Sequence, residues 1–114
     1  MDIRTGFGWI EIDGEHYRHD VIVHRDGSVS RRQKELSRHL RDEYGHTPLT
    51  VEELDFLKEE SPSTVLIGTG QHGDLCLTPG AREFLKDYWT VLLPTPDAIH
   101  ELREGWVAIM HVTC

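Results

Sequence analysis

The order strand, helix, strand, helix, strand in the second half of the chain limits the fold more than any other feature of the sequence. Apolar runs at residues 64–67, 89–93 and 106–112 predict three buried strands, and residues 79–88 and 96–102 carry apolar side chains at helical spacing. Crossovers of this kind are right-handed and place the strands parallel in one sheet that the helices cover. The sequence therefore predicts an α/β domain with a C-terminal βαβαβ segment.

Both helices of this segment are predicted to begin at a Thr-Pro pair. Thr78 precedes Pro79 and Thr95 precedes Pro96, so each threonine is expected to be the N-cap and each proline to occupy the first turn. Gly105 is expected to end the second helical region before the last strand.

The first third of the chain predicts antiparallel strands joined by tight turns. Residues 7–12 and 21–29 contain apolar residues among polar and small ones, and the pairs Asp13–Gly14 and Asp26–Gly27 are typical of hairpin turns. We therefore expect N-terminal antiparallel hairpins.

Two more helices are predicted before the first parallel strand. In residues 33–44 apolar side chains recur every four residues, and Gly45 follows at a position where helices often end in a left-handed residue. The next helix is expected to begin at Thr50, with Glu53 three residues later as its capping-box partner.

Length and charge limit the class of protein. The 114 residues fit a single domain, residues 1–114, and 20 acidic against 12 basic side chains give a formal charge of -8. Because this charge repels phosphate backbones and anionic lipids, we expect neither nucleic acid nor a membrane as a partner. The basic residues between positions 31 and 41 alternate with acidic ones, so they are predicted to form an ordinary solvated face: Arg31, Arg32, Lys34, Arg38 and Arg41.

No apolar run approaches the roughly 18 residues of a membrane span, and the N-terminal residues do not resemble a secretion signal, so a cytoplasmic protein is expected. Cys76 and Cys114 are predicted to be free thiols, because nothing in such a chain requires a disulfide. We expect a monomer or a weak homodimer.

The segment GTGQHG at residues 68–73 matches the dinucleotide fingerprint G-x-G-x-x-G. In a dinucleotide site the helix begins within the glycines, and an acidic residue ends the next strand. Here five residues separate Gly73 from Pro79, and the next strand ends without an acidic residue. The glycines are therefore predicted to serve backbone geometry, and no cofactor is expected.

If the last three strands are parallel, their carboxyl ends share one rim, which could hold a small anion or a carbonyl compound. His111 would be its possible base and Cys114 its possible nucleophile. Against this, Thr95 is explained as an N-cap, and on an extended strand residues 111 and 114 point to opposite faces. No catalytic residue is therefore assigned. The candidate rim residues are Gly68, Thr69, Gly70, Gln71, Thr95, His111 and Cys114.

A metal site is a weaker alternative. His72, Asp74 and Cys76 would share one face of an extended segment, but a fourth ligand is missing. A surface hairpin with Cys76 packed inward is preferred, and no metal is expected.

The segments together resemble the Mth-nine-three-eight domain family over nearly the whole chain. The most specific pieces are IGTGQ at residues 67–71, Thr95 with Ala98 and Ile99, and the closing His111, Thr113 and Cys114. The resemblance implies a three-layer α/β fold with a mixed central sheet and an extra hairpin. The family includes a mitochondrial complex I assembly factor and an adipogenesis-associated protein, and it brings no established catalytic residues.

This chain departs from the family pattern in two places. The helical segment between Gln33 and Gly45 is longer, and the Tyr-Asn pair common in the last helix is absent, with His100, Glu101 and Arg103 there instead. Any ligand that needed that asparagine is therefore in doubt.

Two functions follow from these features. The preferred hypothesis is a non-catalytic protein-interaction or assembly-factor-like module with an unknown protein partner. The alternative is a small-molecule or anion binder, or an enzyme, that uses the loops at residues 68–71, 94–97 and 111–114. A deep pocket in which the side chains of the rim converge would favour the alternative, and an exposed apolar patch would favour a protein partner.

Overall fold

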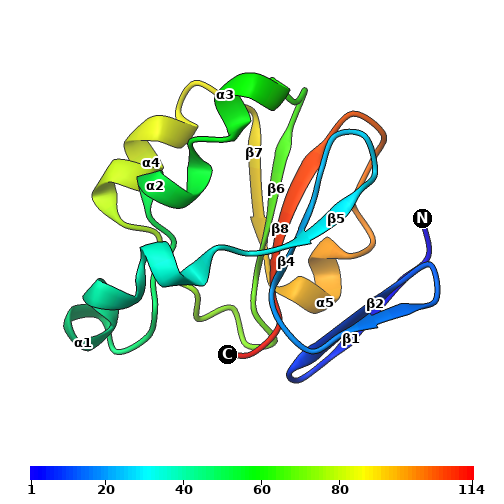
Figure 1. Ribbon diagram of the computed structural model, residues 1–114, viewed down its shortest axis with the longest axis horizontal. Helices are drawn as coiled ribbons and strands as arrows, with labels where there is room; N and C mark the ends of the chain where they lie inside the picture. The colour runs from blue at the N-terminus through cyan, green and yellow to red at the C-terminus, as the bar shows by residue number, and fades with distance from the viewer.

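The computed structural model describes residues 1–114 and forms one mixed α/β domain with two sheets (Figure 1). A small antiparallel sheet has the order β1-β2-β3, and the central sheet has the order β5-β4-β8-β6-β7. The strands are β1 (Ile3–Gly6), β2 (Trp9–Ile12), β3 (Glu15–Tyr17), β4 (Val21–Val23), β5 (Val29–Arg31), β6 (Val65–Thr69), β7 (Thr90–Leu93) and β8 (Val107–His111). The predicted N-terminal hairpins are confirmed, but they are divided between the two sheets.

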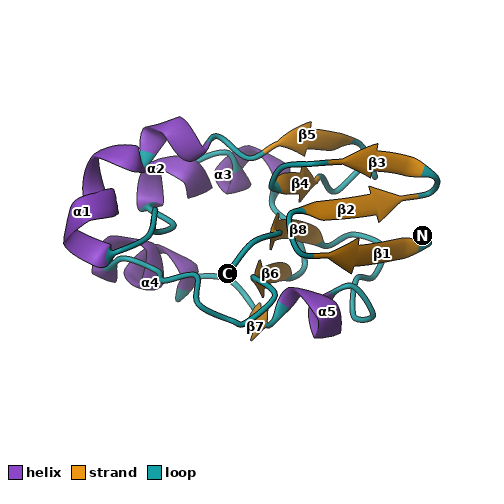
Figure 2. Ribbon diagram, turned by 90° about the horizontal axis from the view of Figure 1, so that it is seen from below, coloured by secondary structure: helices purple, strands orange, loops and turns teal.

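The central sheet is mixed, as the family resemblance implied. Strands β7, β6 and β8 are parallel, whereas β4 pairs antiparallel with β8 and β5 antiparallel with β4. The predicted βαβαβ segment and its three parallel strands are therefore confirmed. Figure 2 shows the small sheet lying beside the central one, with α5 (Thr95–Ala98) close to both.

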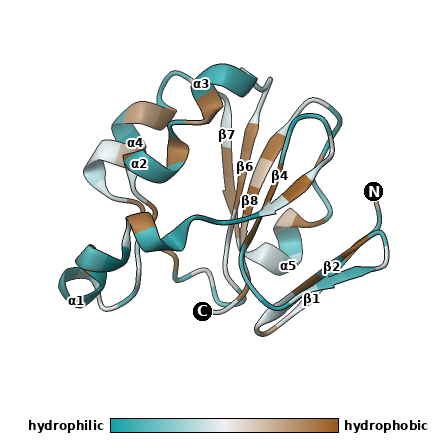
Figure 3. Cartoon of the chain, viewed as in Figure 1, coloured by the Kyte–Doolittle hydropathy of each residue, from teal (hydrophilic) through white to brown (hydrophobic).

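Each face of the central sheet has its own core, because alternate residues of a strand point to opposite faces. Val65 and Ile67 belong to the cluster beneath the helices α2 (Val51–Leu54), α3 (Leu57–Glu60) and α4 (Pro79–Leu85). Leu66 belongs to the opposite cluster, under α5 and the small sheet. Figure 3 shows the hydrophobic residues concentrated in the central strands. None of the helices has the length and apolar composition needed to cross a membrane.

The segment predicted as one helix over residues 33–44 is instead three short turns. These are η1 (Lys34–Leu36), η2 (Arg38–Leu40) and α1 (Arg41–Tyr44), and we call residues 34–44 the extension. The prediction of one helix was wrong because Ser37 is buried and its hydroxyl bonds to Thr50 and Glu53, which draws the chain inward at that point. Gly45 does end the extension in the left-handed conformation.

The capping box predicted at Thr50 is also absent. Thr50 occupies the N-cap position of α2 but makes no side-chain capping bond, because its hydroxyl bonds to Ser37. The Glu53 carboxylate turns to Arg32, which it contacts at 2.7 and 2.9 Å. By contrast, the predicted N-cap of α4 is confirmed: the Thr78 hydroxyl accepts a hydrogen bond from the backbone N–H of Ala81.

Arg32 is the largest fully buried side chain, with 2% of its surface exposed. Its guanidinium donates to the carboxylates of Asp20 and Glu53 and to the carbonyl oxygen of Pro48. Burial by itself would lower the pKa of Arg32, but the two carboxylates raise it above its usual value. The prediction of Arg32 as part of a solvated face was therefore wrong, because two carboxylates distant in sequence compensate its desolvation.

We expect Arg32→Ala to lower the free energy of unfolding by about 3 to 5 kcal/mol, because it leaves two buried carboxylates without their cation. The neighbouring exposed Arg31 provides the matched control, and Arg31→Ala should change stability by no more than about 0.5 kcal/mol. Urea unfolding of both variants measures the difference. Equal losses in the two variants would show that the buried ion network contributes nothing specific.

Candidate functional site

The carboxyl ends of the three parallel strands meet at one edge of the central sheet. Gly68 of β6 lies opposite Leu93 of β7 and Met110 of β8. The loops at residues 68–71, 94–97 and 111–114 therefore adjoin one another, as expected if the last strand runs parallel to the others.

Thr95 holds these loops together and is fully buried. Its hydroxyl accepts a hydrogen bond from the backbone N–H of Gly70 at 2.9 Å and donates to the carbonyl oxygen of His111 at 2.6 Å. Thr95 was predicted to be the N-cap of its helix, and this was wrong: Pro94 occupies that position, without a side-chain bond. The hydroxyl has instead a long-range partner on each side, so it is not available to a ligand.

Gly70 has no room for a side chain. Its φ angle is +104°, and a β-carbon built there would lie 2.4 Å from the carbonyl carbon of Cys114 and 2.8 Å from the His111 ring. Gly68 is also crowded, by the Met110 sulfur and the Thr95 hydroxyl. These glycines permit close approach of backbone segments, as the sequence predicted.

Gln71 and Cys114 connect the rim to neighbouring segments. The backbone N–H of Gln71 donates to the carbonyl oxygen of Thr113, and its side-chain amide donates to the Thr5 hydroxyl at 3.0 Å. The Cys114 carbonyl oxygen accepts from the backbone N–H groups of His72 and Asp74. Thr69 pairs with His111 in the sheet register and is partly exposed.

His111 is buried between an acid and a hydroxyl. Its Nδ1 lies 2.8 Å from the Asp20 carboxylate, and its Nε2 lies 3.2 Å from the Thr113 hydroxyl. Burial alone would raise the pKa of Asp20, but the bond to His111, the charges of His111 and Arg32 and the N–H of Val112 hold this pKa well below its usual range. Asp20 is therefore ionised and accepts a hydrogen bond from Nδ1, while Nε2 lies within hydrogen-bond reach of the Thr113 hydroxyl.

The sequence did not single out Asp20. Its partners Arg32 and His111 lie 12 and 91 residues away, and no local spacing connects them. The only local signal is a carboxylate directly before the apolar strand β4.

The segment considered for a metal does not form a site, and no group of three His, Cys, Asp or Glu side chains is placed to hold an ion. Cys76 is exposed rather than packed inward, and its thiol lies 3.7 Å from the carbonyl oxygen of Asp74. Its neighbours Leu75 and Leu77 are the buried residues of this segment. Both cysteines are free, as expected.

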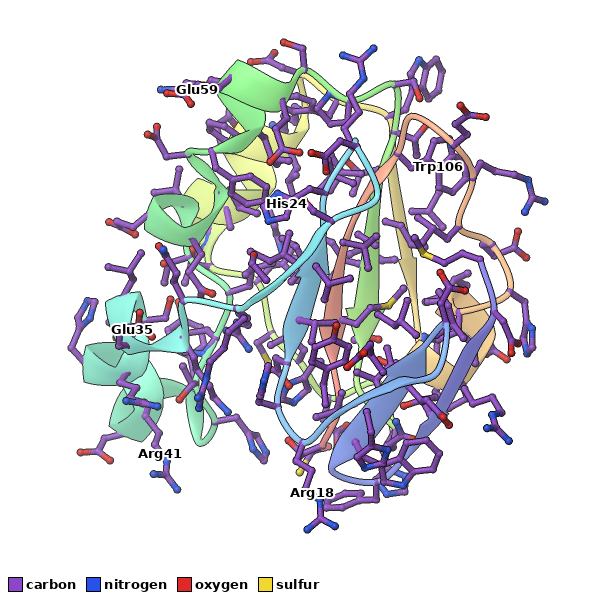
Figure 4. The ribbon with its side chains drawn as sticks, turned by 45° about the vertical axis from the view of Figure 1, so that its right-hand side comes forward. Arg18, His24, Glu35, Arg41, Glu59 and Trp106 are labelled. Atoms are coloured by element: carbon purple, nitrogen blue, oxygen red, sulfur yellow. The ribbon has the colours of Figure 1, made fainter.

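Two hollows open beside the rim, between the extension and the strand ends. The first has a volume of about 560 Å³, and the second has a volume of about 380 Å³. Both are lined by Lys34, Arg38 and Thr113, so they are adjacent, and we call them together the cationic cleft. Figure 4 shows Arg41, on the extension, and Arg18, after β3, near the same end of the molecule.

The charges around the cationic cleft are mainly positive. The first hollow is also lined by Arg18 and Arg31 together with the carboxylates of Asp20 and Glu35, and the second by Arg41 and His46. No carboxylate side chain lines the second hollow, which is also lined by His111, Thr113 and Cys114 of the predicted 111–114 loop. The remaining rim residues serve the scaffold and do not line either hollow.

Two solved structures resemble the whole chain. The conserved hypothetical protein PH1505 from Pyrococcus horikoshii OT3 is 34% identical, with a TM-score of 0.86 and full coverage of both chains. The protein MT938 is 37% identical, with a TM-score of 0.77, over 97% of this chain and 96% of its own. No protein-family model and no curated protein matches the chain.

We expect Gly70→Ala to cost about 3 kcal/mol of stability without any ligand, because overlap with backbone adds to the strain of a positive φ. Gly73 is the matched control, since its φ is +75° but a β-carbon there would make only ordinary contacts at 3.6 Å. Gly73→Ala should cost no more than about 1 to 2 kcal/mol. Thermal and urea melts of dialysed protein measure both, and an unchanged midpoint for Gly70→Ala would contradict its scaffold role.

Proposed function

This chain belongs to the family that includes MT938 and PH1505, and we propose that it is a non-catalytic binding protein whose cationic cleft takes a small anionic ligand. The proposal adopts the alternative that the sequence left open, and places the ligand next to the rim rather than within it.

The observation that carries the proposal is a set of basic side chains without acidic partners. The chain has 20 carboxylate side chains for 12 basic ones, so a basic residue could easily be paired. Nevertheless, five exposed or half-exposed basic residues that line the cationic cleft form no ion pair: Arg18, Arg31, Lys34, Arg38 and Arg41. Like charges gathered in a concave site repel one another, and a bound anion removes this repulsion.

Binding without catalysis is supported by the way the polar rim groups are used. The Thr95 hydroxyl is fully engaged, and the His111 imidazole bonds to Asp20 and Thr113 rather than to the Cys114 thiol. A cysteine nucleophile is commonly activated by a base within hydrogen-bond reach. The rim therefore favours a fixed wall for the cleft over a reacting group.

We expect inorganic pyrophosphate to bind the purified protein with one site, and Arg38→Gln to weaken its binding about tenfold, because Arg38 lines both hollows. Arg82→Gln is the matched control, since it removes the same charge from an exposed position on α4 outside the cleft. Titration calorimetry at low and moderate salt gives both affinities. The proposal fails if pyrophosphate does not bind, or if the two variants weaken it equally.

A protein partner is a second candidate, favoured by the edge of the central sheet. Strand β7 has no neighbour on its outer side, and Trp89 and Leu92 there are 81% and 44% exposed. An unpaired edge beside large apolar side chains is a common docking surface. This edge suits the interaction or assembly-factor-like role that the family resemblance suggested.

If this edge binds proteins, a second copy of the chain is its most accessible partner, and weak dimerisation is expected at high concentration. Trp89→Ser should then reduce dimerisation, whereas Phe7→Ser, at an exposed aromatic residue in the β1–β2 turn, should not. Sedimentation equilibrium over a range of concentrations measures this. A protein that stays monomeric throughout, or one whose dimer is unaffected by Trp89→Ser, would remove the support for this edge.

A further inference from the structure

The two hollows of the cationic cleft share a wall but have separate positive ends. Lys34, Arg38 and Thr113 line both hollows. Arg18 and Arg31 line only the first, and Arg41 lines only the second. One compact anion would use one hollow and leave the cations of the other without a bound anion. Asp20 and Glu35 also line the first hollow, but neither forms an ion pair with Arg18 or Arg31.

The composition of the walls limits the rest of the ligand. The first hollow is lined by no hydrophobic residue, and Cys114 is the only residue of hydrophobic type among those that line the second. Nucleobases and acyl chains are bound on aromatic or aliphatic surfaces, which are missing here. The hydroxyls of Thr113 and Thr47 suit the hydroxyl groups of a polar ligand.

Arginine predominates among the cations, and this favours phosphate groups. Four of the five unpaired cations are arginines, namely Arg18, Arg31, Arg38 and Arg41. The planar guanidinium can donate two parallel hydrogen bonds to the oxygens of a phosphate, whereas a lysine acts as a point charge.

Three of these cations, Lys34, Arg38 and Arg41, belong to the extension, which hydrogen bonds hold against the rest of the protein. Ser37, between η1 and η2, bonds to Thr50 and Glu53, and Glu53 is held by Arg32. The backbone on both sides of Ser37 therefore has a fixed position relative to the sheet. A fixed backbone lowers the entropy lost when a ligand binds between the extension and the strand ends.

We infer that the ligand is a phosphorylated sugar or polyol with two anionic groups, one in each hollow. This inference rests on the proposed anion binding and adds the class of ligand. Arg18 and the first hollow hold one phosphate, Arg41 and the second hollow hold the other, and Lys34 and Arg38 lie between them. The polar body of the ligand lies against the shared wall at Thr113.

The test compares four compounds by titration calorimetry: fructose bisphosphate, fructose monophosphate, pyrophosphate and ATP. We expect fructose bisphosphate to bind at least about tenfold more tightly than the monophosphate, because it engages both groups of cations. ATP should bind no more tightly than pyrophosphate, because no surface in the cleft receives its base.

Two variants test whether each hollow binds one phosphate group. Arg18→Gln and Arg41→Gln alter exposed side chains, so both proteins should melt like the parent. Each substitution should weaken the binding of fructose bisphosphate about tenfold, whereas only one of them should strongly weaken the binding of the monophosphate. Arg82→Gln should leave every affinity unchanged to within about twofold.

The outcomes separate this inference from the proposed function. Three results would overturn the two-group ligand and leave the proposed anion binding intact. These are equal affinities for the monophosphate and the bisphosphate, weaker bisphosphate binding in only one of the two variants, and tighter binding of ATP than of pyrophosphate. If pyrophosphate does not bind, both proposals fail, because the two-group ligand rests on the proposed anion binding.

Discussion

The buried charge of Arg32 connects more parts of the molecule than any other group. It follows β5, and its guanidinium reaches Asp20 before β4, Glu53 in α2 and the carbonyl oxygen of Pro48. Asp20 in turn accepts from the Val112 N–H and from His111 at the end of β8. Such a network stabilises a fold only if every member is satisfied. Here that condition holds, since no buried side-chain nitrogen or oxygen lacks a hydrogen-bond partner.

The same network explains why the cationic cleft lies where it does. It joins the end of β8 to the extension through Glu53 and Ser37, and the two hollows open between these parts. Asp20 and Arg32 line the first hollow and His111 lines the second, so the network itself forms part of the wall of the cationic cleft.

Local patterns predicted the elements of this fold, and long-range contacts decided what its polar side chains do. Apolar runs and a Thr-Pro pair gave β6, β7, β8 and α4, because burial and capping depend on neighbouring residues. The predicted capping box failed because Arg32 draws Glu53 away from Thr50. The Thr95 hydroxyl likewise bonds 16 and 25 residues away instead of capping its own helix. The buried guanidinium of Arg32 determined the contact of Glu53, and the buried backbone N–H of Gly70 determined that of Thr95.

The candidate site was predicted only in outline for the same reason. Sequence spacing placed His111, Thr113 and Cys114 at the edge where the parallel strands end, and they do line the second hollow. The opposite wall comes from the extension, whose basic residues were assigned to an ordinary solvated face. Four of the five basic residues between positions 31 and 41 lie at the surface and line the cleft: Arg31, Lys34, Arg38 and Arg41. The alternation of charges in a sequence does not indicate whether the surface that carries them is concave.

A formal charge of -8 is compatible with the proposed anion site because electrostatic interactions in salt solution are short-ranged. At physiological ionic strength the screening length is about 8 Å, so a small anion in the cleft interacts mainly with the cations that line it. Of the 20 carboxylate side chains, only Asp20 and Glu35 line the cleft, and Asp20 is paired with Arg32 and His111. A long polyanion is different, because its flanking phosphates must pass over the acidic surface outside the cleft and each one adds repulsion. On the proposed function, this charge distribution would favour small anions over nucleic acids, because the cations of the cleft attract phosphate groups and the surrounding acidic surface repels a long polyanion.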